Sequence, residues 1–382
     1  MSITSLLWLA WMAGVTAVYW ALPARFRTAG LIAATAAFLA VYDVTSAAIL
    51  GAFLAVTYYG ADARRLSTRR AILVCTLLFV TLAFYKLRLV TGRDDWLGST
   101  VIPLGISYYT FRCLHYVLER YKGTLRPHGF LDFSAYLLFL PTILAGPIHR
   151  FPAFRKDMAR RRWDSGLFAE GLERILYGYF KIMVIGVYLL SEQWAVSIEA
   201  LEVTRPVLAT YLGVIERTLY GYFTFAGYSD IAIGFARLLG FRVMENFDWP
   251  FLKKNISEFW RSWHISLTSF VREYAYMPLF AVTRNAAFAA VVSMILFGLW
   301  HEFSMRYILW GAYNGAGIAL WQAFQGFKPG LPQFRGTVAR HGLQALSILV
   351  TFHFVAFGFV LTFEPTVRES LSVYATLLTG WW

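Results

Sequence analysis

Residues 286–302 read AAFAAVVSMILFGLWHE, an apolar run from Ala286 to Trp300 that ends in two ionisable residues, His301 and Glu302. Fifteen residues in an α-helix extend only about 22 Å, whereas the hydrocarbon core of a bilayer is roughly 30 Å thick. Such a helix would leave His301 below the far membrane surface. An ionisable side chain at that depth is costly and marks a candidate functional site.

The rest of the chain has the composition of a membrane protein. Of its 382 residues, 58% are hydrophobic and 15% are charged, which excludes an ordinary soluble domain. Apolar segments recur along the chain at residues 6–22, 30–42, 45–60, 71–90, 99–119, 131–148, 168–190, 206–226, 228–240, 271–283, 286–300, 306–323, 343–362 and 370–382. We predict a single all-α, polytopic membrane domain over residues 1–382, with about 11 transmembrane helices. No basic residue precedes the first run, which we expect to be a membrane helix.

The net charge of +13 is distributed over short loops between apolar runs, a pattern typical of membrane topology and not of nucleic-acid binding. Four arginines against one aspartate give residues 61–70 a charge of +3, and six basic residues against one aspartate give 149–163 a charge of +5. Both loops, and the basic loop 324–341, are predicted to face the cytoplasm. The acidic stretch 192–202 is predicted to face outward.

Three apolar segments separate the first two loops. Three crossings would put these loops on opposite sides of the membrane, so one of the segments must be re-entrant, broken or interfacial. An odd number of segments, three, also lies between residue 163 and Arg242. Irregular backbone at membrane depth is tolerated where protein or a water-filled cavity shelters it. We therefore expect re-entrant and interfacial helices around a central tunnel.

Residues 255–270 contain a second candidate, His264. Asn255, with Glu258 three residues later, predicts a helix start. Apolar residues then recur at three- and four-residue steps, which predicts an amphipathic helix in or near the membrane interface. His264 is either functional or a hydrogen-bonded interfacial histidine beside an aromatic belt.

For His301 the functional interpretation is a general base. A low-dielectric site disfavours the charged imidazole, so the neutral form is available to take a proton from an acceptor hydroxyl. The alternative is a histidine bonded to a backbone carbonyl. Glu302 is a candidate to orient His301, although adjacent helical residues point to different faces.

Cys75 and Cys113 lie in apolar segments without metal-ligand spacing, so no disulfide framework or metal site is predicted.

Several ordered motifs add to this picture. They are IPLGISYYTF at 102–111, LAGPI at 144–148, GYSDIAIG at 227–234, ENFDWPF at 245–251, FWRSWHISL at 259–267, GLWH at 298–301 and WGAYNG at 310–315. This set resembles the membrane-bound O-acyltransferases (the MBOAT family), and most closely the bacterial AlgI/DltB-like branch. The resemblance covers a core of about residues 100–325.

The resemblance implies that His301 is the catalytic histidine of a tunnel. A thioester donor, acetyl-CoA or an acyl carrier protein, would enter from the cytoplasm, and the acceptor would enter from the opposite side. His264 would be a second catalytic histidine lining the cytoplasmic approach. Residues expected to line the tunnel or substrate site are Trp300, Glu302, Asn314, Trp260, Trp263, Arg261, Arg112, His115 and Asp230. For the last three, structural hydrogen bonding is the alternative.

The chain departs from the family pattern at three positions. Glu302 stands where glycine is usual, Ser262 where arginine is frequent, and Asn314 where a further histidine is common. The first two would affect the donor or acceptor, and the third removes a possible proton partner. Residues 357–363 do not match the usual ending of the family.

The predicted function is transfer of a short acyl group from a cytoplasmic thioester to a hydroxyl of an exported or cell-envelope glycan. Acetyl is the favoured acyl group. The expected location is a bacterial inner membrane, with membrane lipid, the acyl donor and the glycan acceptor as partners and with no permanently bound cofactor. A second hypothesis is direct passage of the acyl group to a separate extracytoplasmic acyltransferase. A third is a transporter or flippase with a midplane polar site.

Overall fold

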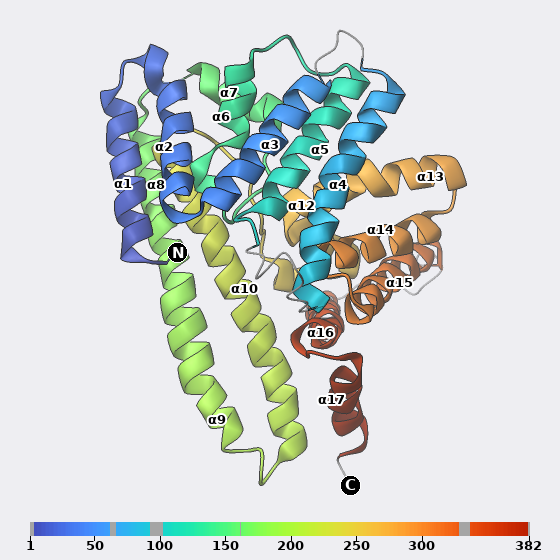
Figure 1. The fold of residues 1–382 in the computed structure, drawn as a ribbon. Helices are drawn as coiled ribbons and strands as arrows, with labels where there is room; N and C mark the ends of the chain where they lie inside the picture. The colour runs from blue at the N-terminus through green and yellow to red at the C-terminus, as the bar shows by residue number, and fades with distance from the viewer. Residues whose placement is uncertain (1–3, 62–65, 92–101, 161, 328–336, 381–382) are drawn as a thin grey trace. The chain divides into compact units, whose positions relative to one another are not determined.

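The computed structural model describes residues 4–61, 66–91, 102–160, 162–327 and 337–380. Parts of the three basic loops and of the predicted segments 99–119 and 370–382 lie outside these ranges. Contacts divide the chain into two compact units, residues 1–180 with 227–245 and residues 181–226 with 246–382. Throughout the described ranges the regular structure is helical, as predicted (Figure 1).

The first unit contains the helices of the N-terminal half. They are α1 (Leu6–Ala21), α2 (Arg27–Tyr42), α3 (Val44–Ala61), α4 (Thr68–Thr91), α5 (Ile106–Lys122), α6 (Phe130–Leu137), α7 (Phe151–Arg160) and α8 (Ser165–Tyr179). The end of α10 (Pro206–Leu238) belongs to the same unit. Each of the first four corresponds to a predicted apolar segment.

The predicted segment 131–148 is broken, which confirms that one of three segments between the basic loops does not cross as a helix. Its helix α6 has eight residues, about 12 Å, and is followed by a single 3₁₀ turn at Leu140–Thr142. Only α4 and α5 then remain as full-length helices between these loops.

The loop predicted at 149–163 contains a helix that the sequence analysis missed. Helix α7 has ten residues, with Phe151, Phe154 and Met158 buried on one side. These apolar residues recur at three- and four-residue steps, but the surrounding basic residues dominate the local composition.

Residues 206–226 and 228–240 were predicted to be two separate apolar segments, and this prediction was wrong. They form one helix, α10, of 33 residues. Residues Ser165–Glu199 likewise form one helical run, in which α8 continues through wider π-type turns at Phe180–Trp194 into α9 (Ala195–Glu199). Two long helices, an even number, therefore separate residue 163 from Arg242.

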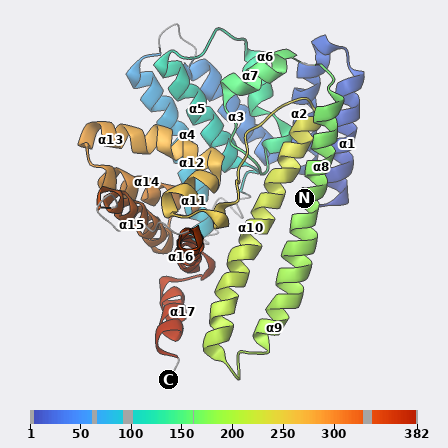
Figure 2. The same cartoon turned by 180° about the vertical axis from the view of Figure 1, so that it is seen from behind.

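The second unit contains the remaining helices. They are α11 (Ile256–Ser262), α12 (Ile265–Val271), a π-helical turn at Arg272–Tyr276, α13 (Met277–Thr283), α14 (Ala286–His301), α15 (Met305–Phe327), α16 (Thr337–Phe363) and α17 (Val367–Thr379). Their arrangement can be followed in Figures 1 and 2. The single amphipathic helix expected over 255–270 is wrong, because the chain breaks into α11 and α12 at Trp263 and His264.

The placement of this segment in or near the membrane interface stays a prediction, and its apolar residues pack against protein. Phe259, Trp260 and Leu267 are buried within the protein, with exposed fractions of 0%, 3% and 0%. Their apolar spacing therefore reflects packing against neighbouring helices. The predicted start is confirmed, because the Asn255 side chain accepts a hydrogen bond from the backbone N–H of Glu258 at 2.9 Å.

Glycines allow α14 and α15 to pack closely. A Cβ atom on Gly311 would lie 2.4 Å from the carbonyl oxygen of Met294, and one on Gly315 would lie 2.5 Å from the Cα atom of Val291. Real Cβ atoms do not approach other atoms so closely, so these backbones can touch only where a side chain is absent. These contacts hold the middle of α14 against α15.

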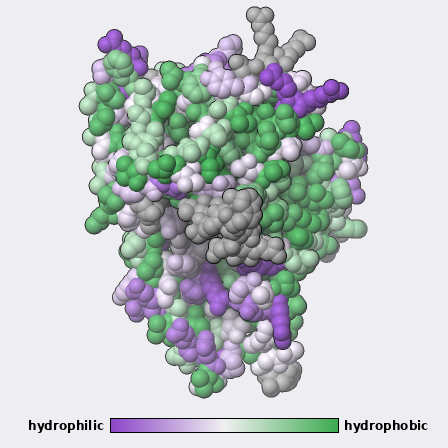
Figure 3. Space-filling view, viewed as in Figure 1, coloured by the Kyte–Doolittle hydropathy of each residue, from purple (hydrophilic) through white to green (hydrophobic). Residues whose placement is uncertain are grey.

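Five helical runs in the described ranges are long and apolar enough to cross a membrane, at residues 24–42, 44–61, 68–87, 165–199 and 337–363. Exposed apolar side chains on α4, including Ile72, Leu77 and Phe84, are typical of a lipid-facing helix. Figure 3 shows apolar residues over much of the face in view. The predicted count of about 11 crossings is not confirmed, and the expected central tunnel stays a prediction.

Candidate functional site

Helix α14 places His301 at its C-terminal end, as the apolar run predicted. The side chain of Asn285 caps the start of the helix by accepting a hydrogen bond from the N–H of Phe288 at 3.0 Å. At the other end, Glu302 has extended backbone and its N–H bonds to the carbonyl of Gly298. Both ends are thus fixed, and the half-buried His301 occupies the last helical position.

Aromatic rings surround the imidazole of His301. The Tyr307 ring stacks on it with centroids 5.5 Å apart, and the Trp310 ring meets it edge-on at 5.7 Å. Phe297 and Trp300, from the preceding turn of α14, lie at 5.4 and 4.4 Å. We call these four rings the His301 cluster. They replace water around the imidazole with weakly polar surface.

His264 contacts the same cluster from the interruption between helices α11 and α12. It adopts a left-handed conformation, with φ 45° and ψ 51°, between α11 and α12. Its ring lies 5.9 Å from that of Trp300 and 6.5 Å from that of Phe297. The two predicted catalytic histidines therefore share Trp300 and Phe297 as ring neighbours.

Asn246 holds the break in place. Its backbone carbonyl accepts a hydrogen bond from the N–H of Ile265 at 2.9 Å, and its side-chain oxygen accepts one from the Ser266 hydroxyl at 2.6 Å. One residue away, Phe247 and Trp263 form an isolated antiparallel bridge. These bonds fix a backbone conformation that costs a residue other than glycine roughly 1 kcal/mol or more.

The His264 ring is 1% exposed, and neither nitrogen has a hydrogen-bond partner among the described residues. Burial, and then the neighbouring His301, lower the pKa of His264 well below its usual range. The ring is therefore neutral at physiological pH. No described residue satisfies the ring, and a buried polar group without a protein partner calls for an explanation.

Two of the predicted lining residues support the cluster from behind. The indole N–H of Trp260 donates to the side-chain oxygen of Asn314 at 3.3 Å. The Asn314 amide in turn donates to the carbonyl of Trp310 at 2.9 Å. Asn314 thus links Trp260 to the backbone of Trp310.

Trp263 and Arg261 lie in different surroundings. Trp263 packs among aromatic rings, including those of Phe247 and Phe359 at 5.2 and 5.3 Å. Arg261 is exposed and donates to the hydroxyl of Ser257 at 3.3 Å. It also lines a cavity of about 230 Å³ together with Trp260 and residues of α14 and α15.

Glu302 forms an ion pair with Arg306, four residues later and in the first turn of α15. Nε and Nη2 of Arg306 donate to the two carboxylate oxygens at 2.9 and 2.5 Å. Nη1 of Arg306 also donates to the backbone carbonyls of Thr362 and Glu364, at 3.1 and 2.6 Å. Arg306 therefore ties the start of α15 to the end of α16, and Glu302 holds its guanidinium group in place.

The predicted residues Arg112 and His115 lie in the other unit, where both have structural contacts. Arg112 is fully buried and donates to the carbonyls of Leu137 and Thr142. His115 accepts a hydrogen bond from the N–H of Phe151 at 3.3 Å. These bonds hold the broken segment after α6 and the start of α7.

Asp230 also lies in that unit and is 3% exposed. Its carboxylate pairs with Nε of Arg174 at 2.7 Å, and Arg174 also pairs with Glu245. Asp230 therefore forms the structural hydrogen bond that was the alternative to a lining role. These ion pairs join α8 to α10 and to Glu245 in the loop after α10.

Sequence reasoning missed Asn246, Arg306 and Tyr307 as parts of the site. Arg306 had a usable signal, because a Glu and an Arg four residues apart pair on a helix. Asn246 stands in the motif at 245–251, but nothing local indicated its role, because its partners Ile265 and Ser266 lie about twenty residues further along the chain.

Comparison with known proteins identifies the family of the chain. A family model described as membrane-bound O-acyltransferase (MBOAT) matches residues 55–329. The probable alginate O-acetylase AlgI of Pseudomonas aeruginosa is 33% identical over 293 residues, covering 75% of this chain and 54% of the relative. The teichoic acid D-alanyltransferase of Bacillus subtilis is 31% identical over 274 residues, covering 68% and 67%. The peptidoglycan O-acetyltransferase of Helicobacter pylori is 26% identical over 309 residues, covering 72% and 56%.

The all-helical fold, its apolar helices and the aromatic site with two histidines define a multi-pass membrane protein. The chain belongs to the membrane-bound O-acyltransferase family. It spans about half the length of the first of these relatives, the AlgI of Pseudomonas aeruginosa.

Proposed function

We propose that the chain transfers a short acyl group from a thioester on the cytoplasmic side of a bacterial inner membrane to a hydroxyl of an exported or cell-envelope glycan. Acetyl is the favoured acyl group. The observation that carries the proposal is the pair of histidines around Trp300 and Phe297 in a chain of this family. The relatives' names, which refer to alginate, teichoic acid and peptidoglycan, support a glycan acceptor.

In the proposed reaction His301 is the general base. Its unprotonated nitrogen takes the proton of the acceptor hydroxyl while the hydroxyl oxygen attacks the carbonyl carbon of the thioester. The new C–O bond forms, the C–S bond breaks, and the leaving thiolate takes the proton back from the imidazolium. The His301 cluster contributes by excluding water, which would otherwise hydrolyse the thioester.

His264 has a different part in this proposal. Its two nitrogens have no hydrogen-bond partner among the described residues, so the neutral ring has one donor and one acceptor free for a bound reactant. We assign it to binding or orienting the reacting groups. His301 keeps the proton transfer, because it is only half-buried whereas His264 is enclosed.

The donor is a thioester of coenzyme A or of an acyl carrier protein, and no cofactor is bound permanently. The proposed tunnel brings this donor and the acceptor to His301 from opposite sides. Transfer is direct or passes through an extracytoplasmic acyltransferase, which would take over the acyl group. The two routes differ in what the chain acylates and share the chemistry at His301.

The test compares His301→Ala with His353→Ala. His353 is a suitable control because it lies on α16 and bonds to the hydroxyl of Tyr211 at 2.7 Å. Both variants should insert into membranes, measured by their yield in the detergent-extracted fraction. His301→Ala should lose thiol release from acetyl-CoA or acyl carrier protein, and mass spectrometry should show no glycan acylation. Thiol release by His301→Ala at the rate of the unmodified protein would refute the proposed mechanism.

The same measurements separate the other hypotheses. A flippase would move glycan across the membrane without releasing thiol from any donor. A route through a partner would keep donor turnover when the partner is deleted, while acyl groups disappear from the glycan.

A further inference from the structure

A second site lies at the tip of the α9–α10 hairpin. Here a cavity of about 650 Å³ is enclosed by residues of α9, the start of α10, and the ends of α16 and α17. It is separate from the His301 cluster, since none of the cluster residues lines it. Its size is in the range of sites that hold small organic molecules.

The core beside this cavity holds the surrounding helices together. Val214 of α10 packs against Ala356 and Val360 of α16, and Val373 and Tyr374 of α17 cover the same cluster. The hydroxyl of Tyr374 donates to the carbonyl of Phe357 at 2.6 Å. Most of the cavity wall is therefore formed by packed helices, while Glu202 and Glu364 lie on the turns that follow α9 and α16.

The cavity is strongly acidic. Glu199, Glu202, Glu216 and Glu364 line it against a single cation, Arg217, which gives four negative charges against one positive charge, a net of −3. The acidic stretch 192–202 of the sequence contributes two of these carboxylates. Hydrophilic residues also gather over the lower part of the face in Figure 3, where these helix ends lie.

Glu216 is the decisive residue. It is 9% exposed, it lines the cavity, and it has no hydrogen-bond or ion-pair partner among the residues that the structure describes. Burying a carboxylate without a partner costs several kcal/mol, roughly, unless a counter-ion or a donor compensates it. Arg217 acts on Glu216 electrostatically but donates its hydrogen bond to Glu364, so a ligand that enters the cavity can supply the donor that Glu216 lacks.

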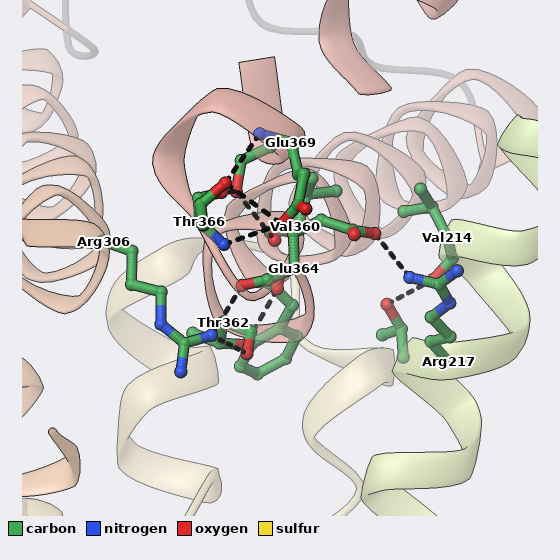
Figure 4. Close-up of polar contacts among 11 residues, drawn as sticks. Val214, Arg217, Arg306, Val360, Thr362, Glu364, Thr366 and Glu369 are labelled. Atoms are coloured by element: carbon green, nitrogen blue, oxygen red, sulfur yellow. Dashed lines mark hydrogen bonds and ion pairs between the residues drawn. The ribbon is translucent and has the colours of Figure 1, made fainter. Parts of the chain in front are cut away.

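Arg217 is already committed to another glutamate. Its Nη1 donates to the Glu364 carboxylate at 2.5 Å, and its side chain is 53% exposed while that of Glu364 is 17% exposed. Figure 4 shows Arg217 reaching Glu364 from α10, while Arg306 bonds to the backbone carbonyls at the end of α16. Arg217 therefore pairs with Glu364, and it acts on Glu216 only through its charge, without forming an ion pair with it.

The chemistry of the walls selects among cations. In the described part of the chain no three His, Cys, Asp or Glu side chains come close enough to hold a metal ion. Apolar side chains, among them Ile198, Val214 and Val373, alternate with the carboxylates around the cavity. This combination suits an ammonium group carried on a short aliphatic chain, whose methylene groups contact the apolar wall while the charge faces the glutamates.

We propose that this cavity binds a small aliphatic amine, with the Glu216 carboxylate as the counter-ion of an ammonium group. A diamine would place its second ammonium group near Glu199 and Glu202, the exposed carboxylates of the hairpin tip. Binding at this site is independent of acyl transfer, so it can be tested without any acyl donor or glycan.

The probe is 1,5-diaminopentane, titrated by calorimetry into the full chain in nanodiscs of phosphatidylcholine, whose headgroups carry no net charge. We expect saturable binding with a stoichiometry of about one. The uncharged analogue 1,5-pentanediol should not bind. Magnesium chloride, added to the same ionic strength as a sodium chloride control, should compete no better than sodium chloride.

Two neighbouring substitutions should act in opposite directions. Glu216→Gln preserves the shape of the side chain and should weaken binding at least tenfold. Arg217→Gln removes the cation of the cavity and should strengthen binding severalfold. Glu192→Gln is the matched control, because Glu192 is exposed on the same helical run but does not line the cavity, and it should bind as the unmodified protein does.

Three results would overturn the proposal. They are the absence of saturable binding, equal affinity in Glu216→Gln and the unmodified protein, and displacement of the diamine by magnesium beyond the effect of ionic strength. If Glu216→Gln does not fold, the opposite prediction for Arg217→Gln still decides the matter, since weaker or unchanged binding there contradicts the assigned charge balance.

Discussion

Replacing Gly298 by alanine should separate α14 from α15 at the point where they hold His301. The added Cβ would lie 2.2 Å from the carbonyl oxygen of Tyr307. An ordinary contact begins at 3.4 Å, so the two backbones must move apart by about 1.2 Å. The ring of Tyr307 stacks on His301, and it would move with its backbone.

The energetic cost follows from two opposing effects. Overpacking against a backbone atom that cannot rotate away belongs at the upper end of the usual range, about 3 kcal/mol. Alanine regains about 1 kcal/mol of helix propensity relative to glycine. The net loss of stability is therefore about 2 kcal/mol. Displacing a reacting group by about 1 Å lowers the rate of a positioned reaction on the order of 100-fold.

The control is Gly326→Ala, in the same helix α15 as Tyr307. A Cβ there meets no atom within 4 Å, so only the gain in helix propensity remains. Thermal unfolding in detergent, followed by tryptophan fluorescence, and thiol release from the acyl donor would be measured for both variants. Gly298→Ala with the unfolding midpoint and turnover of the unmodified protein would show that the α14–α15 contact does not position His301.

Three further predictions concern the surroundings of the two histidines. Asn246→Ala should lower the free energy of unfolding by about 1–3 kcal/mol, since it leaves the buried N–H and hydroxyl of Ser266 without an acceptor; an unchanged unfolding midpoint would contradict this. The depressed pKa of His264 means that below about pH 6.5 the unfolded chain binds a proton that the folded chain does not, so stability should fall as the pH falls. His264→Asn, which suits a left-handed backbone, should reduce the difference in unfolding midpoint between pH 7.5 and 5.5, and an identical difference would count against the neutral buried ring. Arg306→Ala and Glu302→Gly should be non-additive in unfolding free energy by about 0.5–3 kcal/mol, because each removes the same ion pair; strict additivity in the double variant would argue that the pair is not formed.

Local signals in the sequence located the helices and both histidines well. The apolar run 286–300 predicted α14 almost to the residue, because its ends coincide with Asn285 and Glu302, where polar side chains begin. Asn255 predicted the start of α11 for a similar reason, since its cap is formed within three residues.

Long-range contacts were beyond the reach of such signals. The apolar spacing continues from Trp263 to Leu267 as it would in one helix, yet Asn246 fixes a break at His264. Conversely, the sequence was divided into the segments 206–226 and 228–240, yet they form the single helix α10. Within it Asp230 pairs with Arg174, 56 residues earlier, a contact that local spacing does not indicate.

The length of α14 determines where His301 lies and which way it points. A helix advances about 1.5 Å and turns about 100° per residue, so inserting a single residue between Asn285 and His301 would rotate the imidazole away from Tyr307 and Trp310. A deletion would rotate it by the same angle in the other direction. Insertions and deletions should therefore be tolerated in the connections between helices, and α14 should retain its 16 residues.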